Sequence, residues 1–265
     1  MDLTRTLKER LRAGEIAIGG WCMMPGGVGA ELMGSCGFDY VGIDTQHGLL
    51  GQEHVVEMVQ ALSLSGTPTL VRVPSVDADA IMKSLDAGAV GVVVPMVDSA
   101  RQAVDAVAAC RYWPDGQRSY GPLRTAWGPE GYDRLKANRD VICVVMVETV
   151  VAVQQLDSIL EVPGVDAVYV GPSDLAISAG LQPTLQVDDP RHEKLIMQVL
   201  EGCQKRGVVA GIHCADAETA VRWRARGFQM LTLCNDAEML RGAALGMLAT
   251  VAEYESRRFE AIRPK

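Results

Sequence analysis

The sequence predicts a single (β/α)8 TIM barrel over residues 1–265, with a long helix near its C-terminal end. Eight short apolar runs alternate with amphipathic segments, which is the pattern of parallel strands separated by helices. Strands that are covered on both faces are apolar along their whole length, as these runs are. The length of 265 residues also suits one such barrel, which typically takes ~250 residues.

The first half of the chain divides into strands and helices at recognisable boundaries. Leu3, Leu7 and Leu11 repeat at helical spacing, and Gly14 suits the end of that helix. Asp77 is expected to cap a later helix, because its carboxylate can accept the free N–H groups of a first turn. The predicted strands are 17–21, 38–44, 69–73 and 91–95, and the predicted helices are 3–13, 29–36, 52–65, 77–88 and 98–110.

The second half opens with an irregular stretch, residues 111–133, that is rich in turn residues. A long irregular insertion in a compact domain is usually functional. The last predicted helix, 236–259, would be ~36 Å long at the usual rise per residue. The remaining predicted strands are 142–147, 167–170, 208–212 and 230–233, and the other helices end near 160, 207 and 227.

A doubly wound sheet is the alternative fold. It would require a glycine-rich phosphate-binding turn of the form Gly-x-Gly-x-x-Gly after the first strand. Residues 21–29 do not supply that motif. The barrel is therefore the favoured fold.

Composition excludes several classes of partner. A net charge of −8 and a pI of about 5.1 argue against nucleic acid or an anionic membrane. No apolar run approaches the ~20 residues of a membrane span, and the N-terminal segment lacks the apolar core of a signal peptide. Seven scattered cysteines without a Cys-x-x-Cys pair indicate reduced thiols, so a cytoplasmic protein without structural zinc is expected.

Five polar residues fall at or just after the C-terminal ends of predicted strands, where barrel enzymes carry their active sites. Glu148 and Asp174 follow adjacent strands, so their carboxylates are predicted to share a hard divalent cation such as Mg²⁺. The alternative is that each carboxylate caps the helix that follows it. The five residues are Asp44, His47, Arg72, Glu148 and Asp174.

Arg72 lies among apolar residues, and a buried arginine needs an anionic partner. It is either a clamp for a substrate carboxylate or a developing enolate, or a structural ion pair with Asp44 or Glu148. His47 follows Asp44 by three residues, and an aspartate can hold an imidazole in one tautomer as a general base. The other histidines are interpreted as bystanders, with His213 the one nearest the rim.

The stretch Gly171-Pro172-Ser173-Asp174 places backbone N–H groups at the start of a helical turn, which suits a carboxylate. An ordinary βα turn is the alternative. Arg118, in the insertion, either guards the mouth of the site or is solvated.

These residues together resemble the HpcH/HpaI aldolase family over about residues 16–245. Each motif is weak alone, but the set occurs in order. The motifs are Phe38-Asp39-Tyr40-Val41-Gly42-Ile43-Asp44, His47-Gly48, Val71-Arg72-Val73-Pro74, Leu85-Asp86-Ala87-Gly88, Val94-Pro95-Met96-Val97, Glu148-Thr149 and Gly171-Pro172-Ser173-Asp174-Leu175.

The resemblance implies a class II aldolase that cleaves a 4-hydroxy-2-oxo acid to pyruvate, or a close 2-oxo acid, and an aldehyde through an enolate at a divalent metal. Its cofactor would be Mg²⁺, Mn²⁺ or Co²⁺, bound by Glu148 and Asp174. Arg72 would stabilise the enolate oxygen, and His47 paired with Asp44 would be the acid/base. We expect the substrate to contact Arg72, Met146, Gly171, Ser173, Asp174 and Ile212.

The resemblance also implies a hexamer, built as a trimer of dimers that exchange their last helix. Asp86 would act catalytically by reaching the site of a neighbouring subunit. Roles in the catabolism of aromatic compounds or sugar acids are typical of the family. The aldehyde would be chosen by the rim, formed by residues 111–133, 180–190 and neighbouring subunits.

Three positions depart from the family pattern. Gln46 replaces a glutamate, Met146 replaces a glutamine beside the metal, and Ser119 replaces the last glycine of a Gly-x-Arg-Gly motif. These changes bear on substrate preference more than on the enolate chemistry.

Two other functions remain open from the sequence. One is an acyl-CoA lyase of the citramalyl or malyl type, which needs a basic surface for the coenzyme. Arg111, Arg118 and Arg124 are the candidates for that surface. The other is a catalytically silent 2-oxo-acid-binding barrel, with Met146 as a sign of lost activity.

Overall fold

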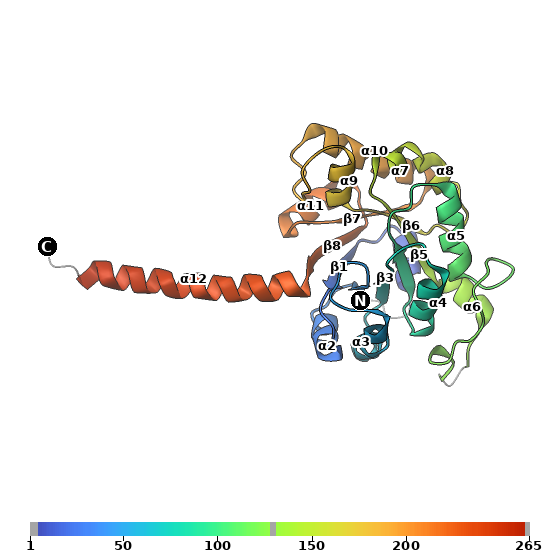
Figure 1. Ribbon diagram of the computed structural model, residues 1–265, viewed down its shortest axis with the longest axis horizontal. Coiled ribbons are helices and arrows are strands. Elements are labelled where there is room, and N and C mark those ends of the chain that lie inside the picture. Colours follow the sequence, from blue (N-terminus) through green and yellow to red (C-terminus); the bar gives the residue numbers. More distant parts are fainter. Residues whose placement is uncertain (1–4, 128–130, 263–265) are drawn as a thin grey trace.

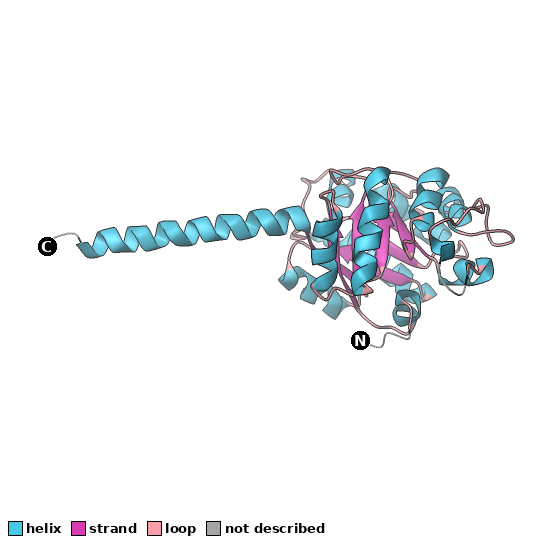
Figure 2. Ribbon diagram, turned by 90° about the horizontal axis from the view of Figure 1, so that it is seen from below, coloured by secondary structure: helices cyan, strands magenta, loops and turns pink. Residues whose placement is uncertain are grey.

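A computed structural model of the chain describes residues 5–127 and 131–262. Its eight strands are all parallel and close into a barrel in chain order, from β1 beside β2 round to β8 beside β1 (Figures 1 and 2). This confirms the predicted (β/α)8 fold. The strands are β1 Ala17–Cys22, β2 Tyr40–Asp44, β3 Thr69–Arg72, β4 Gly91–Val94, β5 Ile142–Val147, β6 Ala167–Val170, β7 Val209–His213 and β8 Met230–Asn235.

The helices surround the barrel, except for the last one. The helices differ from prediction in two ways: α6 and α9 were not expected, and the helix after β5 is divided into α7 and α8. The helices are α1 Leu7–Arg12, α2 Gly27–Ser35, α3 Gln52–Ser65, α4 Ala78–Asp86, α5 Ala100–Cys110, α6 Arg134–Asp140, α7 Val150–Gln154, α8 Leu156–Leu160, α9 Pro172–Ser178, α10 Pro190–Arg206, α11 Ala217–Arg226 and α12 Asp236–Ile262, and a 3-10 turn covers Thr125–Trp127. None of these described helices is long and apolar enough to cross a membrane.

The first helix starts later than predicted because of its cap. Thr6 accepts a hydrogen bond from the Glu9 amide while the Glu9 carboxylate accepts one from the Thr6 amide, a reciprocal capping box. The predicted residue Leu3 lies outside the described residues. Leu7 and Leu11 of α1 pack into the cluster that fills the barrel, so α1 closes the N-terminal end of the strands.

The barrel interior holds large aromatic side chains opposite glycines. Trp21 of β1 pairs in register with Gly42 of β2, and Tyr169 of β6 pairs with Gly211 of β7. A Cβ atom on Gly42 would lie 2.6 Å from the Trp21 ring, and one on Gly211 would lie 2.6 Å from the Tyr169 ring. The glycines therefore create the space that these rings occupy.

A second apolar layer lies between the strands and the helices. Successive residues of a strand point to opposite faces, so each strand contributes to both layers. In β7, Ala210 and Ile212 belong to the outer layer, whereas Val209 belongs to the interior. Burial on both faces explains why the strands read as continuous apolar runs.

The last helix leaves the barrel and projects away from it (Figures 1 and 2). It touches β1 and β8 only where it starts, and its apolar side chains are exposed, among them Leu240 at 64% and Met247 at 69%. In a closed barrel, the helix that follows β8 ordinarily packs on that strand, between α11 and α2. Here α12 does not occupy that position.

Candidate active site

A pocket of about 200 Å³ lies at the C-terminal ends of the strands. It brings together seven of the predicted site residues, from four different strands and the turns that follow them. The predicted residues that line it are His47, Arg72, Met146, Glu148, Gly171, Ser173 and Asp174, and the other lining residues are Trp21, Met23, Pro172, Leu185 and His213.

Glu148 directly follows β5 and is 2% exposed. Its Oε1 atom accepts a hydrogen bond of 2.8 Å from the backbone N–H of Met96. A Cβ atom added to Gly171 would lie 2.3 Å from Oε2. Any larger residue at position 171 would therefore displace the Glu148 carboxylate. Glu148 does not cap α7, because Thr149 is the N-cap and accepts from the Ala152 amide.

Burial raises the pKa of Glu148 to about 7, and the negative charge of Asp174 acts in the same direction. Asp174 lies in the first turn of α9, whose N-cap is Gly171. Gly171 has no side chain to accept the first amides of the helix. The N–H groups at the start of α9 therefore remain available to a ligand.

The two carboxylates fit a hard divalent cation. They occupy adjacent strand ends, and the repulsion between them is the kind that a cation removes. Groups of three or more His, Cys, Asp or Glu side chains placed to hold a metal are absent from the described residues. A site with two carboxylates and otherwise water or substrate oxygens is how Mg²⁺ is usually held, so the donor set is sufficient.

Arg72 is both in an ion pair and open to the pocket. Its Nε and Nη2 atoms donate to Asp44 Oδ1 and Oδ2 at 2.9 and 2.5 Å. Burial alone would raise the pKa of Asp44, but the hydrogen bonds and charge of Arg72 outweigh it and hold that pKa below its usual range. The guanidinium also lies 5.3 Å from the centre of the Trp21 ring.

The structure differs from prediction at the Asp44–His47 pair. The Asp44 carboxylate is turned toward Arg72, and from the His47 loop it accepts hydrogen bonds from the backbone amides of Gln46 and His47. Among the described residues, none forms a hydrogen bond with the His47 imidazole, which is exposed at the mouth of the pocket. Asp44 therefore orients Arg72 and the His47 backbone rather than the imidazole.

The prediction for Ile212 is wrong, and the reason is strand parity. Ile212 is fully buried in the outer layer, facing the helices. The next residue, His213, faces inward and lines the pocket. Sequence reasoning left His213 and Trp21 out of the site, because a strand buried on both faces does not reveal which alternate residues point inward.

Asp86 lies at the opposite end of the barrel, at the end of α4. Its carboxylate accepts a hydrogen bond of 2.5 Å from Arg118, whose side chain is only 3% exposed. Arg118 therefore neither guards the mouth of this subunit's pocket nor lies in solvent. The other described residues of 111–133 also lie away from the pocket. They belong to the connection from α5 to β5 at the N-terminal end of the barrel, so they cannot form the rim of their own subunit's site.

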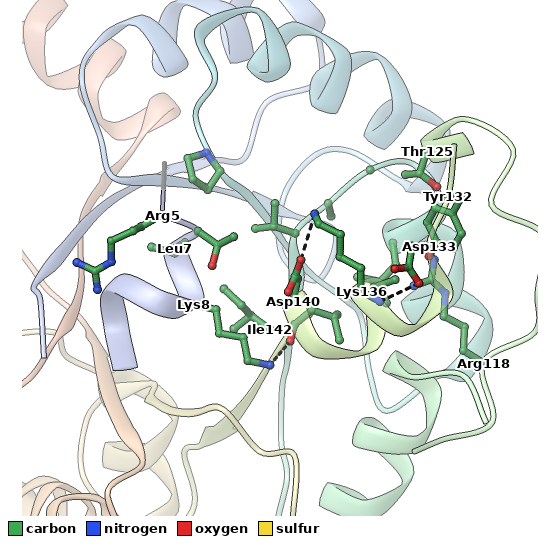
Figure 3. Close-up of a pocket in the computed structure, with 18 of the residues that line it drawn as sticks. Arg5, Leu7, Lys8, Arg118, Thr125, Tyr132, Asp133, Lys136, Asp140 and Ile142 are labelled. Carbon is green, nitrogen blue, oxygen red and sulfur yellow. Dashed lines mark hydrogen bonds and ion pairs between the residues drawn. The ribbon is translucent and has the colours of Figure 1, made fainter. Parts of the chain in front are cut away.

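A larger cavity of about 440 Å³ lies at this opposite end (Figure 3). Its basic side chains are already engaged: Lys136 pairs with Asp140 at 3.2 Å and Lys8 with Asp166 at 2.9 Å. It does not combine a carboxylate pair with a histidine, as the smaller pocket does. We therefore assign the chemistry to the smaller pocket.

Comparison with known proteins finds relatives of the same architecture. The family model of the HpcH/HpaI aldolase/citrate lyase family matches residues 28–243. The hydroxypyruvate/pyruvate aldolase of Rhizorhabdus wittichii is 35% identical over 89% of this chain and 94% of its own. The 4-hydroxy-2-oxovalerate aldolase of Rhodococcus jostii is 31% identical over 94% of this chain and 96% of its own.

A solved structure of an HpcH/HpaI aldolase/citrate lyase family protein from Burkholderia cenocepacia superposes with a TM-score of 0.87 at 30% identity. The superposition covers 93% of this chain and 98% of that one. These matches reflect more than a shared barrel fold, because the sequences are also similar along almost the whole chain. The chain belongs to the HpcH/HpaI aldolase/citrate lyase family.

Proposed function

We propose that this protein is a divalent-metal-dependent aldolase that reversibly cleaves a 4-hydroxy-2-oxo acid to a short 2-oxo acid and an aldehyde. The observation that carries the proposal is that a carboxylate pair, an arginine and a histidine meet in one pocket. The relatives named for aldolase activity support the reaction class. Their names also support pyruvate and hydroxypyruvate as the 2-oxo acids.

Each group has a defined task in binding. The backbone N–H groups of Ser173 and Asp174, at the start of α9, donate to the substrate carboxylate. Glu148 and Asp174 would hold Mg²⁺, Mn²⁺ or Co²⁺, which when bound polarises the 2-oxo group as a Lewis acid. Arg72, oriented by Asp44, points its remaining N–H groups toward the same oxygen.

The cleavage step needs a base and a stabiliser of negative charge. His47 removes the proton of the 4-hydroxyl group. The C3–C4 bond breaks, the aldehyde leaves, and the electron pair of that bond passes into the enolate of the 2-oxo acid. Arg72 stabilises the charge on the enolate oxygen, and a proton then adds to C3 to give the neutral 2-oxo acid.

Hydrogen–deuterium exchange at C3 of pyruvate tests the enolate half of this reaction. Metal-free protein should not catalyse exchange, and added Mn²⁺ or Mg²⁺ should restore it. The variants Glu148→Ala and Asp174→Ala should lose the restored exchange. Exchange that persists unchanged in both variants would sink the metal assignment.

The acyl-CoA alternative loses its support from the insertion. Arg111 pairs with Asp166 at 3.0 Å, Arg118 pairs with Asp86, and Arg124 donates to the Ala87 carbonyl. These arginines therefore form ion pairs and hydrogen bonds at the N-terminal end of the barrel. They do not form a basic surface for a coenzyme beside the pocket of their own subunit. A comparison of pyruvate plus aldehydes with acyl-CoA thioesters as substrates separates the two enzymes. A catalytically silent binding protein would show neither turnover nor exchange.

The projecting helix supports a proposed oligomer, a trimer of dimers in which α12 is exchanged. Its exposed apolar side chains need a partner surface. Val28 and Leu32 of α2 and Val221 of α11 are exposed beside the uncovered strands, where an eighth helix would pack. In such an assembly, Asp86 and the insertion of one subunit would reach the pocket of its neighbour.

A further inference from the structure

His213 is the one histidine of the pocket that the proposed reaction does not use. It is the last residue of β7, and its ring meets the Trp21 ring edge-on, with centres 5.8 Å apart. Trp21 in turn stacks against Tyr169 at 6.1 Å. The imidazole is therefore held in the enclosed part of the pocket, whereas His47 is exposed at the mouth.

One nitrogen of this imidazole is anchored in the barrel interior. Nδ1 lies 3.5 Å from the Tyr169 hydroxyl oxygen. The Tyr169 hydroxyl donates its own proton to Thr232 at 2.6 Å, so toward His213 its oxygen acts as an acceptor. Nδ1 is therefore the nitrogen that carries the hydrogen.

The other nitrogen is left as an acceptor. Burial, followed by the positive charge of Arg72, lowers the pKa of His213 to about 4, so the ring is neutral at neutral pH. A neutral imidazole with hydrogen on Nδ1 has a lone pair on Nε2. Among the described residues, none bonds to Nε2, which is also absent from the buried polar atoms lacking a partner. Nε2 is thus open to the pocket that His213 lines.

The position of a bound 2-oxo acid follows from the other walls. Its carboxylate lies at the start of α9, and its 2-oxo oxygen lies toward Arg72 and the carboxylate pair. In a pocket of about 200 Å³, the third carbon would then face the remaining lining away from the mouth, which is Trp21, Met23, Met146, Pro172, Leu185 and His213. Among these side chains, only the neutral His213 imidazole carries a nitrogen or oxygen acceptor. The aldehyde approaches from the mouth, beside His47.

We propose that His213 selects the 2-oxo acid donor: its Nε2 atom accepts a hydrogen bond from a hydroxyl group on C3, so that hydroxypyruvate is favoured over pyruvate. This assignment rests on the proposed aldolase function. It makes His213 a specificity residue that contacts the donor, with Tyr169 positioning the ring through Nδ1.

The test compares kcat/KM for hydroxypyruvate and for pyruvate, each with saturating Mn²⁺ and glycolaldehyde as the common acceptor. The variant His213→Leu replaces the imidazole with an apolar side chain of similar size and so removes the Nε2 acceptor. Loss of one hydrogen bond should lower the ratio of kcat/KM for hydroxypyruvate to kcat/KM for pyruvate by about tenfold. His213→Gln restores an acceptor and should recover part of the preference.

The thermal unfolding transition of each variant serves as the folding control. Tyr169→Phe should lower the hydroxypyruvate preference by a smaller factor, because the ring loses the contact that sets its tautomer. Equal losses for both donors would show a merely structural role and overturn the proposal, as would an unchanged ratio or a wild-type enzyme that accepts pyruvate alone. A wild-type protein active with neither donor, and silent in pyruvate exchange, would instead overturn the aldolase function itself.

Discussion

Glu148 is held in place by Met96, which lies two residues after the neighbouring strand β4 and donates its backbone N–H to Oε1 at 2.8 Å. Met96 has a φ of 54°, and no other non-glycine residue in the described part of the chain has a positive φ. That conformation costs a side-chain-bearing residue about 1 kcal/mol or more, and such outliers cluster at functional sites. The strain directs one N–H at one carboxylate oxygen and leaves the other oxygen, beside Gly171, for a ligand.

Replacing Glu148 by glutamine should change how stability depends on pH in the metal-free protein. Burial raises the pKa of Glu148 to about 7 in the folded protein, whereas the ordinary pKa of a glutamate carboxyl is 4.5. Preferential protonation of Glu148 in the folded state therefore stabilises the protein fully below pH 4.5, and this contribution is lost as the pH rises through about 7. The free energy of unfolding of wild type relative to Glu148→Gln should fall by up to about 3 kcal/mol across this window. Urea unfolding in the presence of a chelator measures it, and parallel curves for the two proteins would contradict the raised pKa.

Gly171→Ala should weaken metal binding without touching a charged group. The new Cβ atom would lie 2.3 Å from Glu148 Oε2, and the carboxylate would have to move. We expect the affinity for Mn²⁺ to fall at least tenfold by calorimetric titration. Gly29→Ala is the matched control, because nothing lies within 4 Å of its added Cβ atom. Wild-type affinity in Gly171→Ala would argue that Glu148 is not a ligand.

Asp44→Asn should destabilise the protein and reduce activity together. The substitution leaves the guanidinium of Arg72, whose side chain is 13% exposed, without its counter-charge. Breaking a buried pair in this way costs about 2 to 4 kcal/mol. Asp105→Asn breaks the exposed pair with Arg101 and should cost less than about 0.5 kcal/mol in the same unfolding experiment. If both variants lower the free energy of unfolding by a similarly small amount, the ion pair with Asp44 does not stabilise Arg72 in the folded protein.

Mixed oligomers can show whether Asp86 serves a neighbouring site. The variants His47→Ala and Asp86→Asn should each be poorly active alone, with a loss of about 10² or more for His47→Ala. If the two residues come from different subunits, hybrids refolded from both variants contain some intact sites and should regain activity. Hybrids of His47→Ala with Arg72→Ala are the control, because both residues line the same pocket and every site stays defective. No recovery in the first mixture would place Asp86 outside the reaction.

Met247→Glu should dissociate the oligomer if α12 packs on a partner. Met247 is 69% exposed in the subunit and lies on the apolar stripe of the helix. Ala249→Glu is the control, since two positions further along a helix the side chain faces about 200° away. Light scattering coupled to size exclusion gives the mass of each variant. An unchanged mass for Met247→Glu would exclude α12 as the interface.

The barrel and most of its site were predictable because they depend on local patterns. A buried parallel strand is apolar throughout, so Glu148 after β5 and Arg72 at the end of β3 stand out in the sequence. Their convergence follows from topology, since the C-terminal ends of all eight strands meet at one face. The assignment of Ile212 was wrong by one residue, because the sequence of β7 does not reveal which alternate set faces inward.

The sequence by itself determined the eight strands, the face that carries the chemistry and the carboxylate, arginine and histidine that meet there. Tertiary structure alone decided where each side chain points: Asp44 to Arg72 rather than to the His47 ring, His213 into the pocket, and Arg118 to Asp86 at the far end. The physical reason is that periodicity in a sequence encodes burial, whereas ion pairs and hydrogen bonds depend on distances between residues far apart in the chain. A buried charge takes whichever partner the packing brings within reach.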